Sequence, residues 1–262
     1  MKRISFFKKH GLLFCIFIIL AFTLTSCTSK EANNSNTNKQ ELNESSINKN
    51  FILRPSFETS QGTLEAGTAF AVKVEEEENP IIITAMHLFG PDGGLEEEVP
   101  ANELPNFVKK AQFNDTFENS ETIESSKVVL ITEAKPIPDI NKDIAAFIAN
   151  KDAKVSTTEI YVGKLKVGEP VWLAASVVDG EPQDKKLHKA VVTISNEKML
   201  EFKYENPNLN LIATSGAPIL NSEGMVVGIN LSVYTEGKDL IGVANPSISF
   251  HNMLVKALGD KK

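Results

Sequence analysis

Cysteine is nearly absent from this 262-residue chain, which contains only Cys15 and Cys27. Two cysteines so close to the start of the chain cannot form a disulfide framework or a cysteine-rich metal site across a folded domain. The sequence also lacks an HExxH pattern and a glycine-rich phosphate loop. It therefore predicts no metal centre and no bound cofactor, and a domain whose stability comes from core packing.

No uninterrupted apolar run reaches the roughly 20 residues that span a bilayer. Residues 12–22 are apolar and follow a basic start, which is typical of a secretory signal peptide. The next residues, Leu24-Thr25-Ser26-Cys27, resemble a bacterial lipobox, whose cysteine is acylated and becomes the new N-terminus. We expect a signal peptide over residues 1–26, lipid such as palmitate on Cys27, and a position in the cell envelope on the outer side of a bacterial membrane. A plain secretory signal or an N-terminal anchor is the alternative.

Apolar residues are scarce in residues 28–50, which consist almost entirely of Asn, Ser, Lys, Glu and Thr. Such a segment cannot bury enough apolar surface to offset the entropy lost when it becomes ordered. We therefore expect a disordered tether over residues 27–50 and a folded domain over residues 51–262.

Basic residues are the scarcer sign of charge. The predicted signal peptide holds four of the 27 basic residues and no acidic residue, which leaves 23 basic against 34 acidic residues and a net charge of −11. An acidic surface repels nucleic acids and anionic lipid headgroups. We expect no nucleic-acid partner, and contact with a membrane only through the N-terminal lipid.

Short apolar segments recur every ten to fifteen residues from residue 67 onward, with Gly, Pro, Asn and Asp between them. This spacing predicts an all-β sandwich or barrel. The stretch Ile81–Phe89 begins as a fully apolar β-branched run, as a buried strand does. The other predicted strands are Gly67–Val74, Lys127–Thr132, Ile144–Ile148, Glu159–Leu165, Pro170–Ala174, Lys189–Ile194, Met199–Tyr204, Met225–Leu231 and Leu240–Val243.

Two regions depart from the β pattern. Residues 90–124 are polar and acidic, and predict a loop-rich insertion with a short helix at 101–110, although Pro105 disfavours that helix. Residues 246–258 have helical apolar spacing and predict a C-terminal helix with Ser247 or Ser249 as its cap.

The stretch IATSGAPIL, residues 212–220, places Thr-Ser-Gly-Ala-Pro between two apolar runs. It is either a plain turn or an elbow that presents a nucleophilic serine. A serine hydroxyl needs an adjacent base, usually a histidine that a third group orients. Of the four histidines, His10 lies in the leader, His188 in a charged run expected at the surface, and His251 in the predicted terminal helix. His87, directly after a buried strand, is the candidate base.

The orienting acid has four candidates, of which Asp92 and Asp115 lie in polar loop sequence and are expected to be solvated. Asp143 immediately precedes an apolar strand. A carboxylate there is partly buried and needs hydrogen-bond donors, and a histidine Nδ1–H is one. Asp139, four residues earlier, is the alternative.

Six segments resemble, in order, those of the trypsin-like, chymotrypsin-fold serine proteases, most closely the bacterial Deg-type (HtrA-like) domains. They are GTAFAV, IIITAMH, KDIAAFI, KVGEPVWLAA, TSGAPILNSEGMVVGINL and IGVANPSI, which together span residues 67–248. The resemblance implies two six-stranded β-barrels with the active site in the cleft between them, then a short C-terminal helix. We do not expect the peptide-binding PDZ domain that often follows in Deg-type proteases.

The resemblance also implies a Ser-His-Asp triad. Ser215 is the expected nucleophile, His87 the general base and then acid, and Asp143 the orienting carboxylate. The backbone N–H groups of Ala213 and Ser215 are the expected oxyanion hole. The implied activity is that of a serine endopeptidase, which hydrolyses protein or peptide substrates through an acyl-enzyme.

The substrate-binding walls implied by the same comparison are Asn230, Leu231, Ser232 and Gly242. Leu209 lies near the expected base of the specificity pocket, where no acid is present to receive Lys or Arg. We therefore expect a small or medium aliphatic residue on the acyl side of the cleaved bond.

Three residues depart from the family pattern. Ala213 stands where a glycine usually adopts a positive φ, Ala217 replaces a second glycine, and Met86 adds bulk before the histidine. Alanine in a left-handed conformation costs about 1–2 kcal/mol. A second hypothesis is therefore a non-catalytic chymotrypsin-fold lipoprotein that binds peptides or a protein partner. A third is an unrelated β-sandwich lipoprotein. The sequence predicts no oligomeric state.

Overall fold

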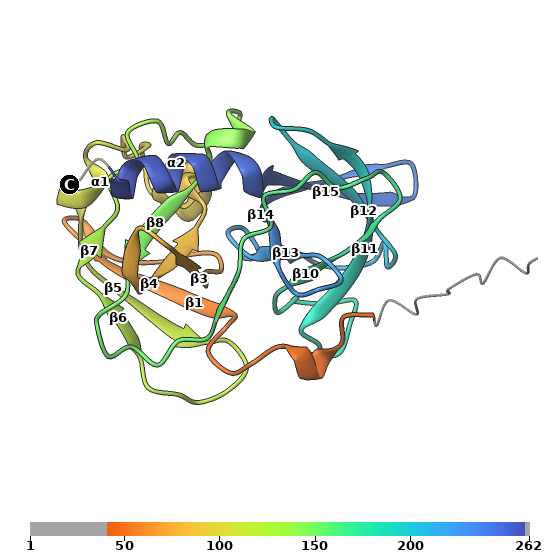
Figure 1. The fold of residues 1–262 in the computed structure, drawn as a ribbon, viewed down its shortest axis with the longest axis horizontal. Helices are drawn as coiled ribbons and strands as arrows, with labels where there is room; N and C mark the ends of the chain where they lie inside the picture. Colours follow the sequence, from red (N-terminus) through yellow and green to blue (C-terminus); the bar gives the residue numbers. More distant parts are fainter. Residues whose placement is uncertain (1–40, 260–262) are drawn as a thin grey trace, which may run out of the picture. The chain divides into compact units, whose positions relative to one another are not determined.

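The computed structural model describes residues 41–259, which form mainly short β-strands. The predicted signal peptide, Cys27 and residues 28–40 of the predicted tether lie outside the described residues. Between residues 41 and 259, no helix combines the length and apolar content needed to cross a bilayer. The all-β prediction with a short C-terminal helix is confirmed (Figure 1).

The N-terminal half contains two sheets whose strands are mostly antiparallel. The first has the order β2-β1-β5-β6 and the second the order β7-β8-β4-β3-β9. A bridge between Leu53 and Ala69 joins them, so this half is two linked sheets where one continuous barrel was expected. Its strands are β1 (Leu53–Thr59), β2 (Gly62–Glu65), β3 (Phe70–Val74), β4 (Glu77–Thr84), β5 (Val108–Asp115), β6 (Ile123–Ser125), β7 (Lys127–Val128), β8 (Ala145–Ile148) and β9 (Thr157–Thr158).

The C-terminal half is a closed six-stranded barrel with the order β10-β11-β12-β15-β14-β13. Its strands are β10 (Pro170–Ala174), β11 (Leu187–Ser195), β12 (Leu200–Tyr204), β13 (Pro218–Leu220), β14 (Val226–Glu236) and β15 (Asp239–Pro246). Burial alternates along β11 and β12, because successive side chains of a strand point to opposite faces of the sheet. In β10, β13 and β15 nearly every residue is buried. The closed barrel leaves this sheet without a free edge.

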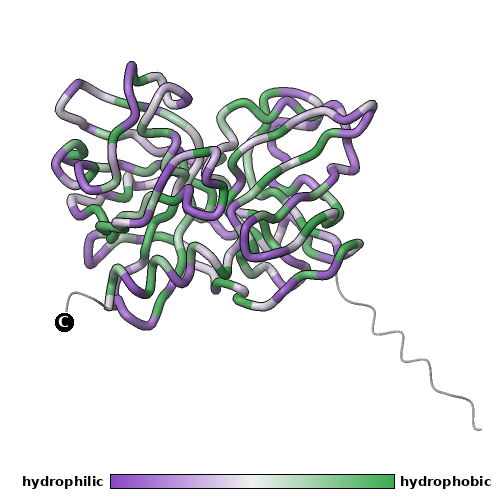
Figure 2. Tube along the Cα trace, turned by 90° about the horizontal axis from the view of Figure 1, so that it is seen from above, coloured by the Kyte–Doolittle hydropathy of each residue, from purple (hydrophilic) through white to green (hydrophobic). Residues whose placement is uncertain are grey.

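Three apolar clusters form the core of the domain. Phe57, Phe89 and Phe147 stack within the N-terminal half, with ring centroids 4.8–6.2 Å apart. A second cluster fills the C-terminal barrel around Phe202. The third lies between the halves, and there Phe70 and Trp172 share one core with the inner face of α2 (Ser247–Gly259). Figure 1 shows α2 running from the barrel back over the N-terminal half, and Figure 2 shows hydrophilic residues concentrated in the outer loops.

Helix α2 confirms the predicted terminal helix, but its serines do not cap it. Phe250, Leu254 and Leu258 form its buried face. The Ser247 hydroxyl donates to the Tyr161 carbonyl, and the Ser249 hydroxyl donates to the Glu197 carbonyl. Both hydroxyls therefore bind neighbouring loops, because the helix begins directly after β15 with the loops packed against its first turn.

The prediction of a helix at residues 101–110 is wrong for most of its length. Only one turn forms, α1 (Leu104–Phe107), and β5 follows at once. Val108, Ala111 and Phe113 are buried in β5 while Lys109 between them is exposed, a strand pattern that charge had obscured. The strand predicted at Glu159–Leu165 is also absent from the described residues, where only Ile160 makes a β-bridge, to Val226.

Residues 41–50, assigned to the tether from composition, pack against the folded domain. The segment contains a single 3₁₀ turn, η1 (Glu44–Ser46). The Glu44 carboxylate accepts the backbone N–H groups of Lys186 (2.9 Å) and Leu187 (3.2 Å) at the start of β11. Ile47 is buried. The folded domain therefore begins at least ten residues earlier than predicted, because one buried apolar side chain and local hydrogen bonds outweigh an otherwise polar composition.

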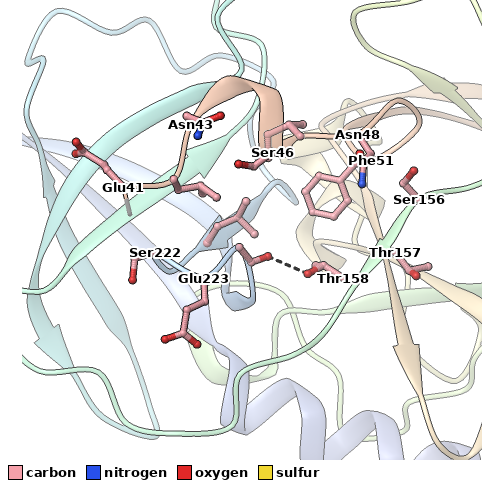
Figure 3. A pocket seen from close by; sticks show the side chains of 14 residues that line it. Glu41, Asn43, Ser46, Asn48, Phe51, Ser156, Thr157, Thr158, Ser222 and Glu223 are labelled. Carbon is pink, nitrogen blue, oxygen red and sulfur yellow. Dashed lines mark hydrogen bonds between the residues drawn. The ribbon is translucent and has the colours of Figure 1, made fainter. Parts of the chain in front are cut away.

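A cavity of about 330 Å³ lies between this segment and the two halves of the domain. Figure 3 shows Asn43, Ser46 and Phe51 from the N-terminal segment around this cavity. On its opposite side, the Thr158 hydroxyl donates to the Gly224 carbonyl at 2.8 Å. The segment thus contacts both halves and is part of the domain.

Candidate active site

The candidate base lies where a buried strand ends. Strand β4 finishes at Thr84, and the 3₁₀ helix η2 (Met86–Phe89) begins two residues later. All four η2 residues are buried, and His87 is only 4% exposed. The first turn of such a helix leaves backbone N–H groups without internal partners. Those N–H groups are available to a nearby acceptor, and Asp143 supplies it.

Asp143 is completely buried and its carboxylate is fully hydrogen-bonded. Oδ1 accepts the backbone N–H of Met86 (2.5 Å) and of His87 (3.1 Å). Oδ2 accepts the backbone N–H of Ile137 (3.1 Å) and lies 2.7 Å from Nδ1 of the His87 ring. Four contacts stabilise a buried carboxylate that would otherwise be costly to desolvate. Of the four acids considered from the sequence, Asp143 is the one that binds His87.

This contact determines the state of the imidazole. A carboxylate only accepts hydrogen bonds, so Nδ1 of His87 carries the proton. In the neutral ring Nε2 is then unprotonated and has a lone pair available as a base. The side chain of Asn245 donates to the Asp143 carbonyl at 3.2 Å and holds the backbone of the acid in place. Sequence reasoning missed Asn245, because no local pattern indicates a partner 102 residues away.

The alternative acid, Asp139, has a different environment. Its carboxylate lies 3.8 Å from the ammonium of Lys135 and about half of its side chain is exposed. His188, expected at the surface, is instead only 1% exposed, and its Nε2 lies 3.0 Å from the Ala175 carbonyl. Its charged neighbours in sequence misled the prediction, since period-two alternation in β11 turns His188 inward with Ala190.

Ser215 is brought to the end of β4 by backbone contacts. Its carbonyl accepts the N–H of Thr68 at 2.8 Å. The next residue, Gly216, has φ +86°, and a Cβ there would lie 2.3 Å from the Thr84 hydroxyl and 3.0 Å from the Ala85 nitrogen. Gly216 therefore packs against Ala85, which is two residues before His87 in the sequence. Only glycine permits so close a contact.

The hydroxyl of Ser215 points toward β14. It donates to the Leu231 carbonyl at 3.1 Å. Within residues 41–259, no hydrogen bond joins Ser215 to His87. The structure therefore forms the His-Asp contact of the predicted triad and not the Ser-His contact. Rotation about χ1 of a half-buried serine exchanges one acceptor for another at small cost, since serine rotamers are staggered wells of similar energy.

Ala213 adopts the strained conformation that the sequence comparison suggested, with φ +64°. Its carbonyl accepts the Thr68 hydroxyl at 2.8 Å, so Thr68 holds this residue as well as Ser215. Neither the Ala213 N–H nor the Ser215 N–H has a hydrogen-bond partner among the described residues. Two unpaired donors flanking a serine are what an oxyanion needs.

Thr214, between these two donors, is anchored in the barrel. Its hydroxyl donates to the Leu211 carbonyl at 2.7 Å. The Asn230 side chain donates to both the carbonyl and the hydroxyl of Thr214, at 3.1 Å each. Since the Gly216 N–H also bonds the Asn230 carbonyl at 2.7 Å, this one asparagine braces the segment on both sides of Ser215.

The four residues predicted to bind substrate, and Leu209 at the predicted pocket base, differ from one another in burial and contacts. Asn230 is 3% exposed, and its amide faces Thr214. Leu231 contributes its carbonyl beside Ser215, and Ser232 is half-buried one residue further along β14. Gly242 lies beneath a ring, since a Cβ there would be 2.3 Å from Phe202. Leu209 is buried in the barrel core.

No protein-family model matches the chain, and no curated protein sequence matches it. Solved structures do. A thermostable serine protease, AL20, from an extremophilic microorganism has a TM-score of 0.56 at 15% identity, over 80% of this chain and 97% of that one. The domain has a chymotrypsin-like fold. The Rv3671c protease of M. tuberculosis in its active form covers 80% of this chain and 81% of its own, at 11% identity and a TM-score of 0.49. The first neighbour is described as a serine protease and the second as a protease, and identity this low establishes the fold alone.

Proposed function

We propose that this protein is a serine endopeptidase that cleaves peptide bonds through an acyl-enzyme on Ser215. The observation that carries the proposal is the buried hydrogen bond between Asp143 and Nδ1 of His87. The Asp143 carboxylate has hydrogen bonds at both oxygens and fixes the imidazole so that Nε2 carries no proton. A histidine that acts as a general base requires this arrangement. The similarity of the fold to that of the serine protease AL20 supports the same proposal.

The proposed reaction begins when the Ser215 hydroxyl turns from the Leu231 carbonyl toward His87. Oγ attacks the substrate carbonyl while Nε2 of His87 takes its proton. The oxyanion that forms lies against the N–H groups of Ala213 and Ser215, which have no other partner in the described domain. His87 then protonates the leaving amine. A water molecule hydrolyses the acyl-enzyme in the reverse sequence of proton transfers.

The acyl side of the proposed site is apolar. Ile212 is 68% exposed and Val178 is 53% exposed. Their segments are joined, since the Val178 N–H donates to the Asn210 carbonyl at 3.0 Å. Together with Leu209, which is buried in the barrel core, these exposed apolar side chains favour a small or medium aliphatic residue before the cleaved bond.

The proposed location is the cell envelope, with lipid on Cys27 holding the domain at the outer side of a bacterial membrane. The support is the lipobox-like sequence at residues 24–27 and the basic and apolar leader before it. Radiolabelled palmitate incorporated by the wild-type chain and not by Cys27→Ala is the expected result.

A fluorophosphonate probe tests the catalytic proposal on the full chain, because it reacts with an activated serine and requires no known substrate. We expect labelling of the wild type that is lost in Ser215→Ala and in His87→Ala, and retained in Ser195→Ala at the end of β11. One observation favours the second candidate, a peptide-binding protein without activity: the Ser215 hydroxyl bonds Leu231 and not His87. Absence of labelling from pH 6 to 9, with saturable peptide binding, would favour that candidate.

A further inference from the structure

A cavity of about 360 Å³ opens beside residues 213–216, which contain the proposed nucleophile Ser215. Gly67 and Ala213 form part of its wall. Both adjoin the proposed nucleophile: a Cβ on Gly67 would lie 2.6 Å from the Ser215 carbonyl, and Ala213 is two residues before the serine. A group bound in this cavity is therefore a neighbour of the bond that Ser215 would attack.

The rest of the wall belongs to the N-terminal half. Arg54 and Ser56 lie on β1, Glu65 at the end of β2 and Asn114 on β5. Leu231, whose carbonyl receives the Ser215 hydroxyl, lies on β14 of the other half. Ser215 thus stands between β14 and the cavity. A peptide whose acyl part follows β14 would place its leaving-group part over the cavity.

Arg54 is the only arginine between residues 41 and 259. Its side chain is exposed and makes no hydrogen bond or ion pair with any other described residue. It faces Asn114 across the β1–β5 pair. The pairs Leu53–Ala69 and Ser56–Glu65 place it opposite the bend at residues 67 and 68, where the Thr68 N–H donates to the Ser215 carbonyl. A guanidinium presents a planar set of donors that matches a carboxylate.

Glu65 lies in the same cavity and does not neutralise Arg54. No ion pair joins the two among the described residues. Glu65 pairs with Ser56. Arg54 lies two residues before Ser56 on β1, so the two charged residues occupy different positions along the strand pair. The cavity therefore offers one positive and one negative charge that are not paired with each other, in a chain whose net charge is −7.

We propose that this cavity is a leaving-group subsite that binds a carboxylate through Arg54, with Ser56 and Asn114 as supporting hydrogen-bond partners. The assignment rests on the proposed peptidase function. The carboxylate belongs either to an acidic side chain within about three residues after the cleaved bond, or to the free C-terminus of a short leaving peptide. Both present the same group to the guanidinium.

Cleavage of a peptide library by the full chain tests this assignment, with products identified by mass spectrometry. We expect the wild type to favour acidic residues, or free over amidated C-termini, just after the cleaved bond by about fivefold, as a solvent-exposed but bidentate Arg–carboxylate pair would give. Arg54→Gln should lose that preference and keep its rate on neutral peptides. Glu65→Gln and the matched cation control Lys73→Gln should keep it. Cleavage before acidic residues inside long peptides indicates a side-chain carboxylate. Cleavage close to free C-termini indicates the terminal carboxylate of the leaving peptide.

Two outcomes would overturn the subsite. One is an equal preference in the wild type and Arg54→Gln, and the other is an Arg54→Gln rate that falls equally on neutral and acidic peptides. The fluorophosphonate probe carries no peptide leaving group, so its rate should be unchanged in Arg54→Gln. If the wild type does not react with the probe, the catalytic proposal fails by itself. Fluorescence anisotropy of labelled Glu- and Gln-containing peptides on the full chain then tests the subsite, and equal affinity for the two would reject it.

Discussion

Asp143 binds His87 twice, once through the ring and once through the backbone. Its Oδ2 lies 2.7 Å from Nδ1 and its Oδ1 accepts the His87 N–H at 3.1 Å. The same carboxylate thus fixes both the position of the residue and the tautomer of its ring. Because both its backbone and its ring are hydrogen-bonded to Asp143, His87 keeps one orientation. A general base needs such a fixed position relative to the group whose proton it takes.

Asp143→Asn should reduce turnover by about 10⁴-fold, the scale known for loss of the correct histidine tautomer. The amide can present an N–H to Nδ1, which would move the ring proton to Nε2. The measurement is fluorophosphonate labelling rate and peptide hydrolysis. Asp139→Asn, which alters only an exposed carboxylate near Lys135, is the control and should be unchanged. Equal losses in both variants would contradict the assignment.

Ala213→Gly should stabilise the protein by about 1 kcal/mol, measured by urea unfolding. Glycine removes the 1–2 kcal/mol cost of a left-handed alanine, while greater freedom in the unfolded chain offsets part of the gain. Labelling by the fluorophosphonate should remain. Ala217→Gly has no positive φ to relieve and should be neutral or destabilising. A destabilised Ala213→Gly would show that φ +64° carries no strain.

Gly216→Ala should abolish labelling and lower the free energy of unfolding by about 2–3 kcal/mol, as overpacking does. A Cβ there would lie 2.2 Å from the Thr68 carbonyl. Gly237→Ala is the matched control, since Gly237 also has positive φ (+61°) but no atom within 4 Å of the added Cβ. Similar costs for the two variants would attribute the effect to φ alone and not to packing.

Stability should fall as the pH drops below about 6.5, because burial lowers the pKa of His188 from that ordinary value. The unfolded chain then binds a proton that the folded chain does not, so the free energy of unfolding decreases with falling pH, by at most about 1.4 kcal/mol per pH unit. His188→Gln keeps a donor for the Ala175 carbonyl and should flatten the profile. His251→Gln, on half-exposed helix surface, should not. Thermal melts from pH 5 to 8 give the comparison.

Glu44→Gln should loosen the N-terminal segment, since a neutral amide is a weaker acceptor for the N–H groups of Lys186 and Leu187. We expect faster proteolysis between residues 41 and 51 and a loss of about 1 kcal/mol in unfolding free energy. Glu41→Gln removes only an exposed ion pair with Lys189 and should have little effect. Identical cleavage in wild type and Glu44→Gln would mean that Glu44 does not hold the segment.

The sequence predicts the all-β class, most strands and the terminal helix because period-two and helical spacing are local properties. It failed at β5, where lysines masked the alternation, and at residues 41–50, where average composition concealed a buried Ile47. His188 was misplaced for the same reason. In each case neighbours in sequence suggested solvent, and neighbours in space supplied a core.

The sequence by itself determined which residue types are available for chemistry: a serine in TSGAP, a histidine after a buried strand, and two acids within four residues of each other. Only the tertiary structure decided that Asp143 and not Asp139 meets His87, that Thr68 and Asn230 brace the segment around Ser215, and that Arg54 and Ala213 line one cavity. The hydrogen bonds among them join residues 16 to 145 positions apart, and strand pairing between distant segments sets them, which no local pattern encodes.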